Sequence, residues 1–337
     1  MTVLPSISPF DAIKLKDSTY CFAHHDFWGG APYFARPKYV PTVRYPHDFM
    51  GHYWTYEGVQ YSRLGDSETV RNYMGINPSV FYNDGYIQPE QIERVIPARI
   101  TMNDFLEFTR KLDDVSLERK AAYDLINHLV EEGVNPAAIG ITGSMLLKGE
   151  VRGFSDFDLV LYGAEAIGKS EKILRSLSAV PNSPLYYRTK EEAKKFYHKY
   201  SVLTDLSDEE FADTFPGKVS QGIMIGIPFS IFQVPTAEEV KILSEPKKLN
   251  NIQSPEREIF NAILENDSYS KFTYKALYQV KKTENDGKIY NIFCYDRACT
   301  EQAQKGETLL IDAEKLDENS YIVYAQAGFI KPLAKKV

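Results

Sequence analysis

Two aspartates with one residue between them, Asp156 and Asp158, lie in the stretch SDFDLVLY. Side chains alternate between the two faces of a β-strand, so both carboxylates point to one face while Phe157 and Leu159 point to the core. The carboxylates are then about 7 Å apart along the strand. Carboxylates at this spacing can hold a divalent metal ion between them. The pattern therefore indicates a metal site on one face of a buried strand.

A Gly-Ser pair, Gly143 and Ser144, precedes the aspartates by a spacer of eleven residues, 145–155. It follows a short apolar strand and opens a short helix, where backbone N–H groups and a hydroxyl suit phosphate oxygens. Mg²⁺ characteristically bridges one or two carboxylates and substrate phosphates. The two halves together predict a site for a complex of Mg²⁺ or Mn²⁺ with a nucleoside triphosphate.

Further candidates for phosphate contact are two residues of the spacer, Arg152 and Ser155, and a later lysine, Lys218. Arginine and lysine supply charge-assisted hydrogen bonds to phosphate. The segment 188–199 is also rich in lysine. Most of its charges are better explained as the solvated face of a helix, with pairs between residues three or four positions apart.

The elements around these residues alternate between strand and helix, which predicts an α/β core over residues 99–245. Ser116 is the expected N-cap of its longest helix, which Gly133 and Pro136 end. The expected elements, in chain order, are helices at 103–112 and from 116, strands at 138–142 and 156–161, helices at 168–178 and 190–200, and a β-hairpin at 222–234.

Both flanks of this core are dense in aromatic residues, which favour pleated sheets, so two β-rich domains are expected. Residues 1–98 should form an irregular β domain with one helix near 66–74. The segment 247–260 is interpreted as a linker. Four strand-like runs after it predict a small β-barrel or sandwich over residues 256–337.

Composition limits the class of protein. The net charge is −7, which argues against a surface built throughout to bind nucleic acid but leaves room for a local basic patch. No apolar run is long enough to span a membrane, and the N-terminus does not look like a signal peptide. An odd number of cysteines, Cys21, Cys294 and Cys299, points to a reducing compartment and to buried thiols. A cytoplasmic protein is expected.

The motif resembles that of the nucleotidyltransferase superfamily of DNA polymerase β, and Gly143, Ser144, Asp156 and Asp158 match it one by one. The wider chain is similar to an uncharacterised archaeal family of predicted nucleotidyltransferases, with a polymerase-β-like α/β core between an N-terminal segment and a C-terminal β domain. The resemblance is carried by residues 34–41, 143–163, 218–235 and 295–307. It implies transfer of a nucleoside monophosphate from a triphosphate to a hydroxyl of a nucleic acid, protein or small molecule, with release of pyrophosphate.

The chain departs from that superfamily at one position. Active members place a third carboxylate on a later strand, yet residues 223–234 contain no Asp or Glu, and Ser230 or Gln233 could occupy its place. Carboxylates from 205–213, or Glu150 in the spacer, are the other candidates. A second function therefore stays open, namely a nucleotide- or RNA-binding module that keeps the site without turnover.

Overall fold

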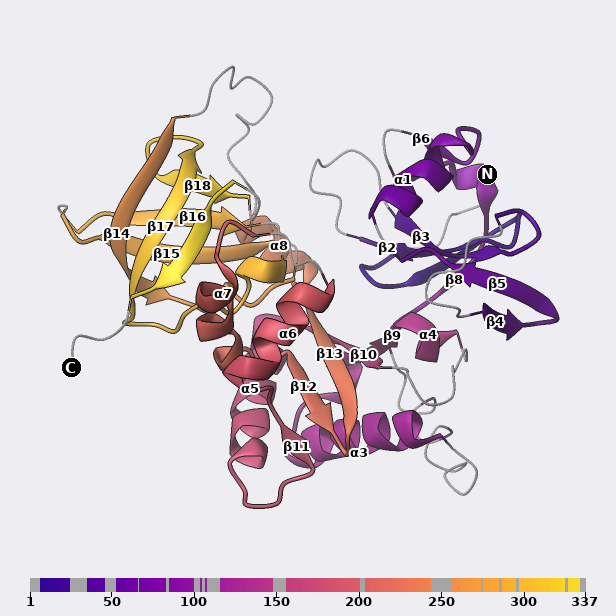
Figure 1. The fold of residues 1–337 in the computed structure, drawn as a ribbon, viewed down its shortest axis with the longest axis horizontal. Coiled ribbons are helices and arrows are strands. Elements are labelled where there is room, and N and C mark those ends of the chain that lie inside the picture. Colours follow the sequence, from indigo (N-terminus) through magenta and orange to yellow (C-terminus); the bar gives the residue numbers. More distant parts are fainter. Residues whose placement is uncertain are drawn as a thin grey trace. The chain divides into compact units, whose positions relative to one another are not determined.

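The protein has a mixed α/β fold, drawn in Figure 1. It forms two compact units, Met1–Val160 with Ile227–Ser230, and Leu161–Gly226 with Ile231–Val337. The expected domain boundaries near residues 98 and 245 stay predictions. The computed structural model describes residues 7–24, 35–45, 53–65, 67–82, 85–99, 104, 107, 116–147, 156–200, 204–243, 256–273, 275–284, 287–294, 297–324 and 327–333.

The N-terminal part of the first unit is a six-stranded antiparallel sheet in the order β4-β5-β3-β2-β1-β8. Within the described residues of this part, one α-helix, α1 (Ser67–Gly75), packs on the sheet, as the sequence predicts. A short hairpin of β6 (Phe81–Tyr82) and β7 (Tyr86–Ile87) follows α1. The sheet strands are β1 (Ala12–Leu15), β2 (Tyr20–Ala23), β3 (Ala35–Pro41), β4 (Tyr53–Tyr56), β5 (Val59–Arg63) and β8 (Ile92–Ile96).

The two faces of this sheet have different partners because its side chains alternate. One face packs aliphatic residues such as Ile13 and Leu15 against α1. The other face is aromatic, with the Tyr20 ring 5.5 Å from that of Tyr61. This aromatic face packs against Leu147, which directly follows the short helix α4 (Gly143–Leu146). The sheet is therefore built against the segment that carries the Gly-Ser pair.

The α/β part contains a five-stranded sheet in the order β11-β12-β13-β10-β9. The longest described helix of the first unit is α3 (Leu117–Glu131). The Ser116 side chain accepts a hydrogen bond from the Arg119 N–H, as predicted for the N-cap of this helix. The strands are β9 (Ile139–Thr142), β10 (Phe157–Tyr162), β11 (Leu185–Tyr186), β12 (Gln221–Met224) and β13 (Ile227–Val234); the helices of the second unit are α5 (Ala164–Ser178), α6 (Lys190–Tyr200), α7 (Asp208–Thr214) and α8 (Ala237–Ile242).

The predicted hairpin at 222–234 is present as β12 and β13. Its turn consists of Ile225 and Gly226, whose φ angles are 51° and 80°. Two successive residues with positive φ are typical of the tight turns that join antiparallel strands. The expected helix at 103–112 falls largely outside the described residues.

The C-terminal part is a barrel, which decides between the two expected architectures. Strands β14-β15-β16-β18-β17 close through β14 and β17, with β16 and β18 parallel and β19 added at the edge of β17 (Figure 1). The prediction of a linker over 247–260 is wrong from residue 257 onward, because β14 begins there. The strands are β14 (Arg257–Asn266), β15 (Ala276–Lys282), β16 (Ile289–Cys294), β17 (Thr308–Lys315), β18 (Ser320–Val323) and β19 (Phe329–Pro332).

A lysine of the barrel, Lys282, is surrounded by aromatic rings. The Lys282 ammonium in the barrel lies 4.1 Å from the centroid of the Phe260 ring and donates a hydrogen bond to the Tyr321 hydroxyl. All three cysteines are buried, as expected, and none of them forms a disulfide. Among the described residues, no helix is both long and apolar enough to cross a membrane.

Candidate functional site

The two aspartates of the motif lie at the start of β10, in the first unit. Phe157 and Leu159 are fully buried, whereas Asp158 is half-buried and Asp156, directly before the strand, is exposed. This alternation confirms the predicted orientation of the strand, with the apolar residues toward the core. The carboxylate-bearing face is therefore accessible at the start of β10, whereas Val160, further along the same face, is buried.

The Gly-Ser pair and the aspartates meet at Gly143. This residue begins α4 with a φ of +69°, and a Cβ atom built on it would lie 2.6 Å from Oδ2 of Asp158. Real Cβ atoms do not approach other atoms so closely. The Asp158 carboxylate therefore lies against the backbone of Gly143, and a side chain at position 143 would force this carboxylate to move. Ser144, the next residue, is half-buried in the same short helix.

Residues near the N-terminus hold β9 and α4 in place. The Thr142 hydroxyl donates to the Phe10 carbonyl over 2.9 Å, and the Ile141 N–H donates to the Ala98 carbonyl over 2.8 Å. The Asp11 carboxylate accepts the Ala98 N–H over 2.8 Å. Asp11 is 3% exposed, and this burial raises the pKa of its carboxyl group above the usual value, against the lowering effect of its backbone hydrogen bonds. The sequence carried no signal for these contacts, because each joins distant segments.

The strand beside β10 is β13, where the superfamily pattern requires a third carboxylate. The rings of Phe157 and Phe229 stack with centroids 5.6 Å apart, so these two residues share a face. Alternation then places Ser230, which is half-buried, on the same face as Asp158. Gln233 has the opposite orientation and is buried. Of the two candidates on β13, only Ser230 thus lies on the face that carries Asp158.

The acidic residues at 205–213 were the other candidates for a third ligand. Each of them forms an ion pair within the second unit, and Ser207 and Glu210 form a capping box at the start of α7. The pairs are Asp205 with Arg257, Asp208 with His198, Glu209 with Lys190 and Lys194, Glu210 with Lys331, and Asp213 with Lys190.

Lys218, a candidate phosphate ligand, is enclosed in the second unit. It is 3% exposed, and its ammonium group donates to the Ala298 carbonyl over 2.7 Å and lies 5.9 Å from the Phe211 ring centroid. Burial lowers its pKa to about 8, although the Glu301 carboxylate acts in the opposite direction. The Lys218 ammonium is therefore bound within the second unit and is not exposed to a phosphate ligand.

The burial of Lys218 predicts that its contribution to the free energy of unfolding depends on pH. Because its pKa of about 8 in the folded state is below the ordinary lysine value of 10.5, the folded state binds fewer protons than the unfolded state between these two pH values. Lys218→Met should therefore raise the free energy of unfolding by about 2–3 kcal/mol at pH 7. The gain should shrink as the pH rises from 8 to 10.5, as measured by urea unfolding. Lys172→Met, on the exposed side of α5, is the control, and an equal gain at every pH would contradict the prediction.

The remaining candidates, Arg152, Ser155 and Glu150, lie outside the described residues. Within the part of the chain that the structure describes, no group of three or more His, Cys, Asp and Glu side chains is placed to hold a metal ion. Two carboxylates on one strand face nevertheless suit a single Mg²⁺ that completes its shell with water and phosphate oxygens. The donor set present therefore fits one ion of this kind.

No family model, curated protein or solved structure matches the chain.

Proposed function

We propose that the protein is a metal-dependent nucleotidyltransferase, which moves a nucleoside monophosphate from a triphosphate to an acceptor hydroxyl and releases pyrophosphate. The observation that carries the proposal is the contact between Asp158 and Gly143. It joins the phosphate-binding half of the motif to the metal-binding half. The order β9-β10-β13 supports the proposal too, since it puts the Gly-Ser strand, the Asp-x-Asp strand and the later strand side by side.

In this function Asp156 and Asp158 hold Mg²⁺ or Mn²⁺. Gly143 offers its backbone and Ser144 its hydroxyl and backbone to the β- and γ-phosphates. A bound divalent ion offsets negative charge on the transferring phosphoryl group and aligns the attacking oxygen. The acceptor hydroxyl releases its proton to water, its oxygen forms a bond to the α-phosphorus, and the bond between that phosphorus and the leaving pyrophosphate breaks. The Thr142 hydroxyl, at the end of β9, donates to the Phe10 carbonyl just before β1, which helps to hold the Gly-Ser segment in place.

One observation favours the second candidate function, a nucleotide-binding module with weak turnover. Ser230 stands on the metal-facing side of β13, and a neutral hydroxyl is a poorer ligand for Mg²⁺ than a carboxylate. Such a module binds the metal–nucleotide complex through the same aspartates. The two functions therefore share a binding prediction and differ in turnover.

The binding prediction is tested by titrating each of the four nucleoside triphosphates into the protein with Mg²⁺, with Mn²⁺ and with a chelator. At least one triphosphate should bind in a metal-dependent manner, and Asp158→Asn should weaken that binding by about tenfold or more, since metal affinity depends on the carboxylate charge. Asp124→Asn is the matched control, because Asp124 is a half-buried aspartate of α3 in the same unit.

Both functions would be contradicted if Asp158→Asn bound triphosphate like the wild type, or if the wild type bound it equally well with the metal and with the chelator. Release of pyrophosphate on addition of an acceptor separates the transferase from the binding module.

A further inference from the structure

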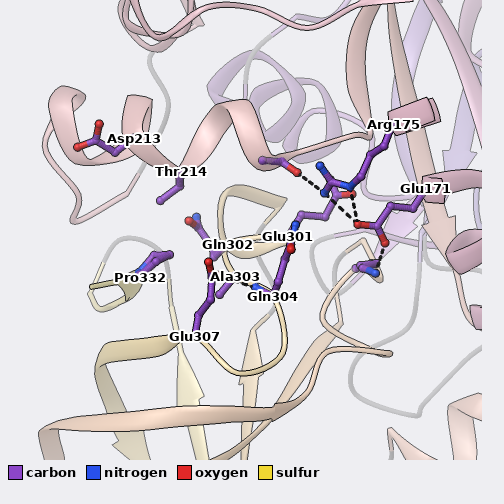
Figure 2. Close-up of a pocket in the computed structure, with 12 residues that line it drawn as sticks. Glu171, Arg175, Asp213, Thr214, Glu301, Gln302, Ala303, Gln304, Glu307 and Pro332 are labelled. Carbon is purple, nitrogen blue, oxygen red and sulfur yellow. Dashed lines mark hydrogen bonds and ion pairs between the residues drawn. The ribbon is translucent and has the colours of Figure 1, made fainter. Parts of the chain in front are cut away.

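The cavity of the second unit does not supply a cation for phosphate. It measures about 220 Å³ and is surrounded by side chains of α5, of α7 and of the loop 301–307 (Figure 2). The two cations of its lining, Arg175 and Lys271, both bind the Glu171 carboxylate. Within the described part of the motif, phosphate binding therefore depends on the backbone and hydroxyl groups of Gly143 and Ser144, and hence on how accurately these two residues are held.

The strand that leads to the Gly-Ser pair lies at the edge of its sheet. Within the five-stranded sheet, β9 pairs with β10 on one side only. On the other side, the Ile141 N–H donates to the Ala98 carbonyl over 2.8 Å. Arg99 adds an isolated antiparallel bridge to Gly140. The position of β9 at this edge therefore depends on what holds Ala98.

A buried carboxylate holds Ala98. Oδ1 of Asp11 accepts the Ala98 N–H and Oδ2 accepts the Ser8 N–H, each over 2.8 Å. Asp11 and Ala98 are both buried, so water does not readily replace the bond between them. A carboxylate satisfies two N–H donors because it only accepts. A protonated carboxyl group keeps one full acceptor, and an amide turns its NH2 donors toward one of the two N–H groups.

The residue before Asp11 makes a second contact, to the end of β9. Phe10 is the third residue of a turn that begins at Ser8, since the Asp11 N–H donates to the Ser8 carbonyl over 3.1 Å. Its φ is +72°, which is rare for a bulky side chain and persists only where the surrounding contacts hold it. Its carbonyl accepts the Thr142 hydroxyl over 2.9 Å. The turn 8–11 is thus bound both to Ala98 and to the residue that precedes Gly143.

The charged and titratable groups around Asp11 come from two segments. Burial raises the pKa of its carboxyl group, while the N–H groups of Ala98 and Ser8 and the positive charge of Arg99 act in the opposite direction. On the other side of the turn, the His24 ring lies 6.1 Å from the Phe10 ring, centroid to centroid. The titration of Asp11 is therefore closer to neutral pH than that of an ordinary aspartate.

We infer that Asp11 is a positioning residue of the nucleotide site, whose ionised carboxylate fixes Ala98 and the turn 8–11 against β9 and so keeps Gly143 and Ser144 where phosphate binds. Asp11 acts through these neighbours and not on the nucleotide itself. The effect on binding rests on the proposed function, whereas the fixing of β9 does not. The N-terminal sheet thereby gains a role in nucleotide binding, because Asp11 directly precedes β1.

The test compares Asp11→Asn with Asp17→Asn in the full-length protein, with folding checked by circular dichroism. Asp17 is the matched control, because its carboxylate also accepts a backbone N–H, that of Thr19 over 2.9 Å, at the opposite end of β1. In titrations of the nucleoside triphosphates with Mg²⁺ at pH 7, Asp11→Asn should weaken binding about tenfold and Asp17→Asn should leave it unchanged.

The pH profile separates positioning from a contribution to stability alone. The ratio of the affinities of wild type and Asp11→Asn should fall toward one between pH 7 and pH 5, because protonation removes the same negative charge from the wild type. Contributions of the triphosphate, the metal ligands and His24 are common to both proteins and cancel in this ratio. A residue that only stabilises the fold gives a ratio of one at every pH.

Hydrogen exchange supplies a readout that needs no nucleotide. The Ile141 N–H should exchange about tenfold faster in Asp11→Asn than in the wild type, and as in the wild type in Asp17→Asn. If Asp11→Asn does not fold, Thr142→Val takes its place, since it removes the hydroxyl that binds the Phe10 carbonyl at similar volume, and the same two effects are expected.

The outcomes distinguish this inference from the proposed function. A wild type that binds no triphosphate contradicts the proposed function, and hydrogen exchange then decides the inference by itself. Where the wild type binds triphosphate, the inference is overturned if Asp11→Asn binds it equally well at pH 7. In either case it is overturned if the Ile141 N–H exchanges at the same rate in both proteins.

Discussion

Replacing Gly143 with alanine is expected to lower the free energy of unfolding by about 1–3 kcal/mol and to weaken metal-dependent nucleotide binding by about tenfold or more. Two effects add at this position. The φ of +69° is strained for any residue with a side chain, and the new Cβ would lie 2.6 Å from the Asp158 carboxylate. The carboxylate has to move, and the metal and phosphate halves of the site then separate. Urea unfolding and titration of the triphosphates measure the two effects.

Gly58→Ala separates the strain from the collision. Gly58 lies in the turn between β4 and β5 of the same unit with a φ of +77°, and a Cβ on it meets no atom within 4 Å. Strain alone should cost about 1 kcal/mol, with nucleotide binding unchanged. If the two alanine variants have the same stability and bind nucleotide equally well, the contact between Gly143 and Asp158 is not needed for nucleotide binding.

Local features of the site could be predicted from the sequence because their causes are local. The orientation of Asp158 follows from the alternation of β10, and the start of α3 follows from the hydroxyl of Ser116. The hairpin of β12 and β13 likewise follows from an apolar run interrupted by Gly226. Each of these elements depends on a few adjacent residues.

The contacts that hold the site together could not be predicted, because they join distant positions. Thr142 and Phe10 are 132 residues apart, and Ala98 and Asp11 are 87 apart. Strand β14 was missed for a different reason. Its outward residues Ile259 and Ile263 are apolar, which hides the alternation by which a strand is recognised.

Lys218 shows how a charged residue can mislead. A lysine close to an apolar strand was a reasonable phosphate ligand, since most lysines are exposed. The structure instead buries its ammonium against the Ala298 carbonyl and the Phe211 ring. Nothing in the sequence distinguishes this lysine from an exposed one, because its environment comes from α7 and from the loop before β17.

Ser230→Asp is expected to increase nucleotidyl transfer by about tenfold or more, because a third carboxylate beside Asp158 strengthens the metal site on the face where the acceptor is activated. Mn²⁺ affinity in the presence of triphosphate, measured by electron paramagnetic resonance, should rise with it. Ser230→Asn is the control, with nearly the same shape and no charge. The residue is half-buried and on the accessible face of β13, so the substitution does not place a charge in the core.

The outcome of this substitution also distinguishes the two proposed functions. A binding module that lost its third ligand should gain turnover with Asp and not with Asn. A wild type that already transfers nucleotides at the rate of the Asp variant must draw its third ligand from elsewhere in the chain, and the idea that Ser230 limits the site would then be wrong. If neither variant changes Mn²⁺ affinity, β13 does not face the metal, and the shared face inferred from Phe157 and Phe229 does not extend to the site.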